Sequence, residues 1–302
     1  MTAVLRHLRI RDPLFGRIEL REPWGGPSSP DADLLLHHVV EGTAYLHLDG
    51  PPVEIRAGGV VLLAGCAHAL SHGPGRPGPE TRFWDGPSES VGPSAVRRRL
   101  GGSGSQTVIL CASASLEGAA SRLLLSSLPP VVHVECASEL PGFALVLDCI
   151  RDEVSSNRAG APAMLARYAE MLLLLVVRAN TSPTRGWTAA LADVGLGRAL
   201  AALYEDPARS WTVVELARTA GMSRSRFSEC FRDQVGESPI RHLTRWRMAL
   251  AQDLLAAGSR VGAVAACVGY SDEAAFSNAF RREVGVSPGQ FRDTARSVSN
   301  PP

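Results

Sequence analysis

The N-terminal part of the chain alternates short apolar runs with turns rich in Gly and Pro. Turn signals such as Asp49-Gly50-Pro51-Pro52 and Ala57-Gly58-Gly59 separate these runs. Short runs bounded by such turns are typical of strands in an all-β sandwich or a small barrel. The predicted strands are residues 14–20, 34–41, 43–48, 53–56, 60–63 and 68–70.

The pattern then changes twice. Residues 71–106 are rich in Gly, Pro and Ser, which predicts an irregular loop, and residues 107–112 predict a strand that returns to the β-domain. From about residue 138 the apolar positions recur every three or four residues, which predicts one helix and then a second over residues 163–178. The second helix is apolar on nearly all sides and must be buried on more than one face. It packs either between the β-domain and its neighbour or in a homodimer interface.

A polar stretch that contains Pro183 and Gly186 follows the second helix. Such stretches mark boundaries between domains. We therefore predict a first domain over residues 1–180, a linker over 181–189 and a second domain over 190–302.

The second domain contains an internal duplication. It matches Gly221-Met222-Ser223, Phe227 and Phe231 with Gly269-Tyr270-Ser271, Phe276 and Phe280. The offset is 48 residues up to the Ser and 49 from the first Phe onward. The second copy therefore has one extra residue at the start of its second helix.

Each copy has the mechanics of a helix-turn-helix. A short helix ends at Gly221 or Gly269, where a residue without a Cβ can take a positive φ and turn the chain sharply. Ser223 or Ser271 is then expected to cap the next helix. That next helix buries its two Phe residues and presents polar side chains on its other face. In a helix-turn-helix protein this face enters the major groove of DNA.

The outward faces of the two second helices supply the candidate DNA contacts; the alternative is a merely solvated face. Arg can read guanine, Asn can read adenine, and Glu can accept from cytosine. The candidates are Arg224, Ser225, Arg226, Ser228, Glu229 and Arg232 in the first copy, and Asp272, Glu273, Ser277, Asn278, Arg281 and Arg282 in the second. Those placed best for phosphate contacts lie nearer the helix ends: Arg226, Arg232, Arg281 and Arg282.

The segment between the two copies, residues 240–256, has apolar residues at helical spacing. A helix of about 15 residues is roughly 22 Å long. This length would let both recognition helices meet major-groove segments about 34 Å apart. We therefore expect one monomer to bind an asymmetric half-site.

The second domain resembles the AraC/XylS family of bacterial transcription regulators. The resemblance lies in 211–213, 216–217, 221–227, Phe231, 236–239, 243–248, 269–271, 275–276, 280–282 and 285–288. His242 and Asn278 depart from the family pattern, which usually has Tyr and Arg there. Departure at Asn278 affects the expected base preference of the second recognition helix.

The N-terminal half resembles the cupin-like sensor domain that often precedes this module, on the basis of residues 36–42 and 57–68. The resemblance implies an α+β protein in which a cupin-like β-barrel with a helical hairpin precedes an all-α domain with two helix-turn-helix motifs. It also implies a DNA-binding transcription regulator whose barrel senses a small molecule, a metal or an oxidant. Cupin enzymes carry a fuller set of metal-binding His and Glu residues, so we expect no enzymatic activity. A metal-dependent cupin enzyme fused to a DNA-binding domain is the alternative.

Histidine and cysteine residues gather in the part of the chain that resembles the sensor domain. His37 and His68 stand where this type of domain tends to have His, and Cys66 and His72 lie close to them in sequence. Imidazole and thiolate are preferred ligands of transition metals such as zinc. Alternate residues of a strand face opposite sides, so of His37 and His38 only one points inward, and we take it to be His37. Otherwise the histidines are satisfied polar side chains of the barrel, or Cys66 beside His68 is a reactive thiolate that senses oxidants.

Composition and charge narrow the class of protein. Residues 1–185 carry 17 Arg and 18 acidic residues and the remainder 14 and 12, and the net charge of the chain is +1. This is a weak electrostatic footprint for a DNA-binding protein, so its affinity depends on well-placed contacts. No apolar run has the roughly 20 residues of a membrane span, and we expect a cytoplasmic protein without a membrane partner. The expected partners are double-stranded promoter or operator DNA, RNA polymerase, an effector and a second copy of the chain.

Overall fold

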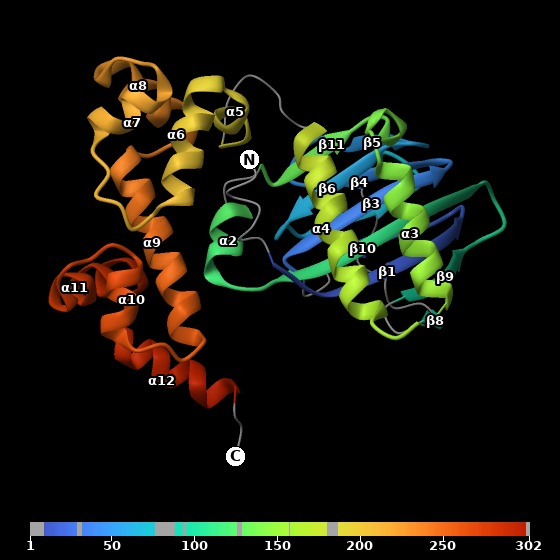
Figure 1. The fold of residues 1–302 in the computed structure, drawn as a ribbon. Helices are drawn as coiled ribbons and strands as arrows, with labels where there is room; N and C mark the ends of the chain where they lie inside the picture. Colours follow the sequence, from blue (N-terminus) through green and yellow to red (C-terminus); the bar gives the residue numbers. More distant parts are fainter. Residues whose placement is uncertain are drawn as a thin grey trace. The chain divides into compact units, whose positions relative to one another are not determined.

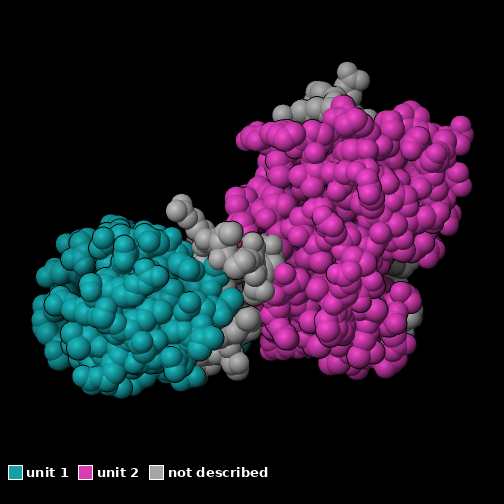
Figure 2. All heavy atoms as spheres, turned by 90° about the horizontal axis from the view of Figure 1, so that it is seen from above, with its two compact units in different colours: residues 1–9, 117–128, 181–302 teal, residues 10–116, 129–180 magenta. Residues whose placement is uncertain are grey.

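The computed structural model of the chain describes residues 9–28, 32–75, 88–92, 95–125, 129–156, 158–179 and 187–299. The chain divides into two compact units, which Figure 2 shows in different colours. The barrel unit consists of residues 10–116 and 129–180, and the helical unit of residues 1–9, 117–128 and 181–302. This division differs from the predicted one at residues 1–9 and 117–128, which lie within the predicted first domain. Of the predicted linker, residues 181–186 lie outside the described residues, and helix α5 begins at Trp187.

Two β-sheets form the barrel unit. The larger has the strand order β11-β6-β3-β10-β1-β9-β8 and the smaller the order β2-β7-β4-β5. The strands are β1 (Ile10–Arg21), β2 (Gly25–Ser28), β3 (Leu34–Glu41), β4 (Thr43–His47), β5 (Val53–Arg56), β6 (Val60–Ala64), β7 (His68–Ser71), β8 (Ser88–Gly92), β9 (Ala95–Gly101), β10 (Gln106–Leu116) and β11 (Val131–Val134). Each predicted strand is present, and its ends lie within four residues of the predicted ones. A cupin-like barrel is therefore the fold of this unit.

One apolar core fills the space between the two sheets. Ile18, Leu46, Ile55 and Leu63 are among its fully buried side chains. A short 3-10 helix η1 (Ala137–Glu139) precedes helices α3 (Phe143–Ser156) and α4 (Ala161–Ala179), and Figure 1 shows both helices lying along the large sheet. Helix α4 packs on β1, β6 and β11. This packing accounts for much of its apolar surface.

The prediction of an irregular loop over residues 71–106 is wrong for residues 88–92 and 95–101, which form β8 and β9. The sequence pattern does not indicate these two strands, because β9 carries three successive arginines and pairs with β8 at the edge of the sheet. Strand β2 has no counterpart among the predicted strands, since Gly and Pro in an edge strand are typical of a turn. Residues 76–87 and 93–94 of the predicted loop lie outside the described residues.

The helical unit is built around the long helix α9 (Figure 1). Its elements are α2 (Ala119–Leu125), α5 (Trp187–Ala192), α6 (Val194–Glu205), α7 (Val213–Ala220), α8 (Arg224–Val235), α9 (Pro239–Ala256), α10 (Val261–Cys267), α11 (Glu273–Val284) and α12 (Pro288–Ser299). The first part of α9 packs with the first copy, where Phe231 of α8 contacts the ring of His242. The last part joins the core of the second copy through Met248, Ala251 and Leu255. The predicted helix over residues 240–256 is confirmed.

The extra residue of the second copy has a structural consequence at the start of α11. In the first copy Ser223 caps α8 by accepting a hydrogen bond from the Arg226 N–H. In the second copy the cap is Asp272, whose carboxylate accepts from two backbone N–H groups of α11. The prediction of a Ser271 cap is wrong because the inserted residue moves the cap one position along the chain.

The predicted turns at the two glycines are confirmed. Gly221 and Gly269 have φ of 71° and 83°. A Cβ at Gly269 would also lie 2.2 Å from the carbonyl oxygen of Ala208, so this turn depends on glycine both for its φ and for close approach of the backbone.

Helix α2 has no counterpart among the elements predicted from periodicity. It belongs to the helical unit and packs on α9, although strands of the barrel unit precede and follow it along the chain. Within the described residues, no helix is long and apolar enough to cross a membrane.

Candidate nucleic-acid interface and barrel histidine pair

The first candidate recognition helix, α8, is fixed on one side and exposed on the other. Phe227 and Phe231 are fully buried, and their rings lie 5.6 Å apart between centroids. Ser223 caps the start of the helix, and Gly236 ends it with a φ of 85°. A packed and capped helix holds its outward side chains in fixed positions.

The polar side chains of α8 differ in their exposure and in the hydrogen bonds and ion pairs that they form within the protein. Arg224, Ser225, Arg226, Glu229 and Arg232 are exposed, and Ser228 is half-buried. The Ser228 hydroxyl donates to the Arg224 carbonyl oxygen at 2.9 Å, so it is partly used within the helix. Arg226 pairs with Glu229 at 3.6 Å. The Arg224 guanidinium has no hydrogen-bond or ion-pair partner in the described part of the chain, which leaves it open for a base edge.

The second candidate recognition helix, α11, offers fewer open groups. Asp272 is engaged in the cap, and the Glu273 carboxylate leans toward α10, since a Cβ at Gly262 would lie 2.7 Å from its Oε2 atom. Asn278 and Arg281 are exposed. Ser277 is half-buried, and the exposed Arg282 pairs with Glu283 at 3.5 Å. Asn278 and Arg281 are therefore the side chains of this helix best placed for DNA.

A buried polar network supports α8 from behind. His242 of α9 contacts the Tyr204 hydroxyl at 2.5 Å through Nε2 and the Glu237 carboxylate at 2.9 Å through Nδ1. Arg245 pairs with the same carboxylate at 3.0 Å. Burial raises the pKa of Glu237, but the bonds from His242 and Arg245 outweigh it and hold the pKa below its ordinary value. His242, which stands where the family usually has Tyr, therefore has a structural role in this network.

In the barrel unit the structure brings His37 and His68 together. Their Nε2 atoms lie 3.0 Å apart, and both side chains are buried. The Nδ1 atom of His37 contacts the Cys111 thiol of β10 at 3.0 Å. Burial lowers the pKa of both histidines, that of His37 well below its ordinary value, and raises the pKa of Cys111. All three groups are therefore neutral at pH 7.

Neutral rings fix the direction of the hydrogen bonds in this cluster. The Nδ1 atom of His68 lies 3.2 Å from the Cys66 carbonyl oxygen, which only accepts, so Nδ1 carries the proton. The His68 Nε2 atom then accepts from His37 Nε2–H, and His37 Nδ1 accepts from the Cys111 S–H. These tautomers follow from the bonding partners. We refer to Cys111, His37 and His68 as the relay.

The other two predicted metal or effector residues lie apart from the relay. The Cys66 thiol lies against the Pro130 carbonyl oxygen at 3.5 Å and does not contact the His68 ring. Burial raises the pKa of Cys66, which disfavours the thiolate form of this side chain. His72 Nδ1 contacts the backbone of Trp24. His38 faces α3, where its ring meets Phe143 edge-on at 5.5 Å.

Sequence reasoning missed Cys111. It lies within a predicted strand, but only the pairing of β10 with β3, which sets Cys111 opposite His37, makes it part of the cluster. Among the described residues, no group of three or more His, Cys, Asp or Glu side chains is arranged to hold a metal ion. The relay therefore offers two imidazole nitrogens and one thiol without a carboxylate.

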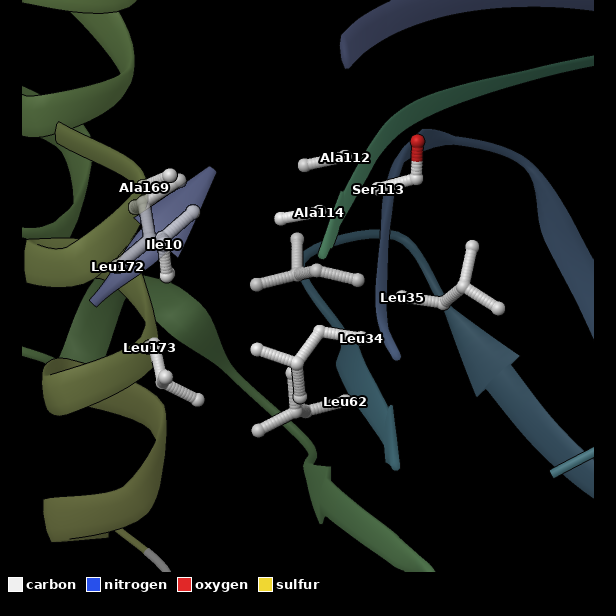
Figure 3. A pocket seen from close by; sticks show the side chains of 11 residues that line it. Ile10, Leu34, Leu35, Leu62, Ala112, Ser113, Ala114, Ala169, Leu172 and Leu173 are labelled. Atoms are coloured by element: carbon white, nitrogen blue, oxygen red, sulfur yellow. The ribbon is translucent and has the colours of Figure 1, made fainter. Parts of the chain in front are cut away.

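An apolar cavity lies between α4 and the large sheet (Figure 3). Ile10, Leu34 and Leu62 lie on the sheet side, and Ala169, Leu172 and Leu173 on α4. Its volume is about 30 Å³, room for water-sized groups only. The cavity does not admit an organic effector unless α4 moves.

The chain matches two protein families and several curated proteins. Residues 1–182 match the family described as Cupin, and residues 216–294 match the family described as Helix-turn-helix domain. An AraC-like transcription regulator of Streptomyces lividans is 33% identical over 304 residues, which cover 96% of each chain. The chain belongs to the AraC-like transcription regulators. It is a DNA-binding regulator with a cupin-like N-terminal domain.

Other AraC-like regulators also match over most of the chain. The RCS-specific transcriptional activator RclR of Escherichia coli is 29% identical over 87% of this chain and 85% of its own. Among solved structures, the DNA-binding domain of AdpA in complex with a target DNA is 32% identical over 35% of this chain and 96% of its own, with a TM-score of 0.34. All the relatives described here are named as transcription regulators.

Proposed function

We propose that α8 and α11 read the two parts of one promoter element and that α8 supplies the stronger contact. The observation that carries this proposal is that both helices present exposed polar faces while their Phe pairs anchor them to opposite parts of α9. Arg224 is open for guanine, and Asn278 for adenine. RNA polymerase is the partner through which a promoter-bound regulator would act.

Selection of bound fragments from a random DNA library by the full chain tests this function. Recognition by both helices should enrich a site with two elements about one helical turn apart, near 34 Å along the DNA. A guanine is expected in the element that α8 reads. Enrichment of one short element alone would contradict reading by both helices.

We propose in addition that the relay is the signal input of the barrel. The apolar core fills the space between the two sheets, and the cavity beside α4 has room for water-sized groups only, so a bulky effector is disfavoured. A transition-metal ion such as zinc is the candidate signal, because His37 and His68 direct two nitrogens to one point. These two nitrogens are half of a tetrahedral zinc set, and the other ligands would come from solvent, because the Cys111 thiol lies at Nδ1 of His37 and not at Nε2.

Removing one of the two nitrogens should weaken this binding. In a calorimetric titration of zinc into the full chain, we expect H37A to weaken binding at least tenfold, since even loss of an outer-shell partner costs about that much. His133 is a matched control, because it lies on β11 of the same sheet and takes no part in the relay. H133A should bind zinc like the wild type. Equal binding by wild type and H37A would contradict the proposal.

We propose a second copy of the chain as the partner of the outer face of α3 and α4. Met164 and Met171 of α4 and Leu145 of α3 remain 43%, 47% and 67% exposed in a helix pair whose other side is buried on the sheet. Charged residues at both methionines should oppose burial of this face. We expect sedimentation of the full chain to show a dimer that the double variant M164E/M171E weakens at least tenfold. An unchanged dimer, or a monomeric wild type, would contradict this interface.

A further inference from the structure

Helix α2 connects two strands of the barrel unit but packs in the helical unit. Strand β10 ends at Leu116, α2 spans Ala119–Leu125, and β11 begins at Val131. Residues 117–125 nevertheless belong with α9 in the helical unit, and Ala120 and Ser121 are almost fully buried there. A simple connection between two strands would not need these contacts.

Asp253 of α9 holds the start of α2. Its carboxylate accepts hydrogen bonds from the Ala119 N–H at 2.5 Å and from the Ala120 N–H at 3.2 Å. Burial raises the pKa of Asp253, and the two backbone bonds oppose that rise, as expected for a carboxylate enclosed by this contact. In the next turn of chain, the Ser121 hydroxyl oxygen accepts from the Arg9 N–H at 2.9 Å.

Gly118 permits the close approach of this carboxylate. Its φ is +86°, and a Cβ would lie 2.9 Å from both Asp253 carboxylate oxygens. Any side chain at this position would have to push Asp253 away from α2. The contact therefore depends on one residue from each side, Gly118 and Asp253, which can be altered independently.

Strand β10 leads directly from the relay to this contact. Cys111 of β10 contacts His37, and the strand ends where the Leu116 N–H donates to the Asp33 carboxylate at 2.7 Å. The next residues of the chain are Glu117 and Gly118. A change at the relay that shifts β10 would therefore pull on the start of α2.

We propose that residues 117–125 are the coupling segment through which the barrel acts on DNA binding, and that Asp253 is the positioning residue that holds this segment to α9. Helix α9 carries the cores of both helix-turn-helix units, so a shift at Asp253 changes how the two recognition helices are held. The contact itself is independent of the signal. The assignment of the relay as its source rests on the function proposed above.

Operator binding by the full chain tests the coupling segment without knowledge of the signal. We expect D253A and G118A to change the affinity for the selected DNA in the same direction and by about fivefold or more, a common size for a coupling effect. D253N, which keeps one acceptor oxygen, should fall between D253A and the wild type. In hydrogen exchange of the full chain, D253A should also speed exchange at the Ala119 and Ala120 amides.

Two control variants match the two substitutions. Gln252 precedes Asp253, and its Nε2–H donates to the Met248 carbonyl oxygen at 3.3 Å within its own helix. Gly142 has the same φ as Gly118, but a Cβ there would meet no atom within 4 Å. Q252A and G142A should stay within about twofold of the wild type. If D253A and G118A behave like these controls, the proposal is overturned.

A double-mutant cycle separates signal coupling from simple support of the fold. H37A is expected to change operator affinity in the wild-type background and to have little effect in the D253A background. An equal effect of H37A in both backgrounds would overturn the coupling segment and leave the relay as input. No effect of H37A in either background would contradict the relay as input, and the affinities of D253A and G118A would then decide the coupling segment alone.

Discussion

F280A should strongly destabilise the second helix-turn-helix unit. Phe280 is fully buried, and its ring contacts Phe276 and Phe291, each at 5.7 Å between centroids. Replacing a buried Phe by Ala costs about 3–5 kcal/mol, which is a large fraction of the 5–15 kcal/mol that stabilises a typical domain. Hydrogen exchange of the amides in α10, α11 and α12 should accelerate about a hundredfold or more.

The matched control is V286A, because Val286 lies just after α11 and is 42% exposed. It should change stability by no more than about 0.5 kcal/mol. The strands of the barrel unit should exchange at wild-type rates in both variants, since F280A acts on another core. Unchanged protection of α10 to α12 in F280A would show that this core does not stabilise the unit.

The helical unit was predictable because local signals and the fold agree there. The repeated Gly, capping residue and Phe pair each act over one or two helical turns, so their spacing alone gives both helix-turn-helix units. The exception is the start of α11, where Ser271 was predicted as the cap. Two neighbouring residues of capping type, Ser271 and Asp272, give the same local signal, and only the position of the helix decides between them.

The barrel unit was predictable in strands β3 to β7 and not in β8 and β9. Strands β3 to β7 are short, largely apolar runs with clear turns between them, whereas β8 and β9 lie at an edge of the large sheet and carry polar residues. Cys111 joins the relay only through the pairing of distant strands. The start of helix α2 is held by Asp253, a residue far away in the chain, and a local sequence pattern cannot predict such a partner.

The base-reading role of Arg224 predicts an effect that depends on DNA sequence. R224A should weaken binding to the selected site by about 1–3 kcal/mol, or roughly 5- to 150-fold, and should relax the preference at one base pair. The physical reason is that the Arg224 guanidinium, which has no protein partner among the described residues, exchanges water for a bidentate bond to guanine and breaks no ion pair there. Binding isotherms on the selected site, on a site with that base pair changed and on random DNA measure this effect.

Arg226 is the matched comparison, since it lies on the same helix and already pairs with Glu229. If Arg226 contacts phosphate, R226A should weaken binding to selected and random DNA by the same factor and lower the salt dependence by about one counterion. The net charge of the chain is close to zero, so the general electrostatic attraction to DNA is weak. The loss of a single contact should therefore be easy to measure in the affinities of R224A and R226A. An equal loss on both kinds of DNA for R224A as well would mean that α8 positions the protein on the backbone, and base reading would then belong to Asn278 and Arg281 of α11.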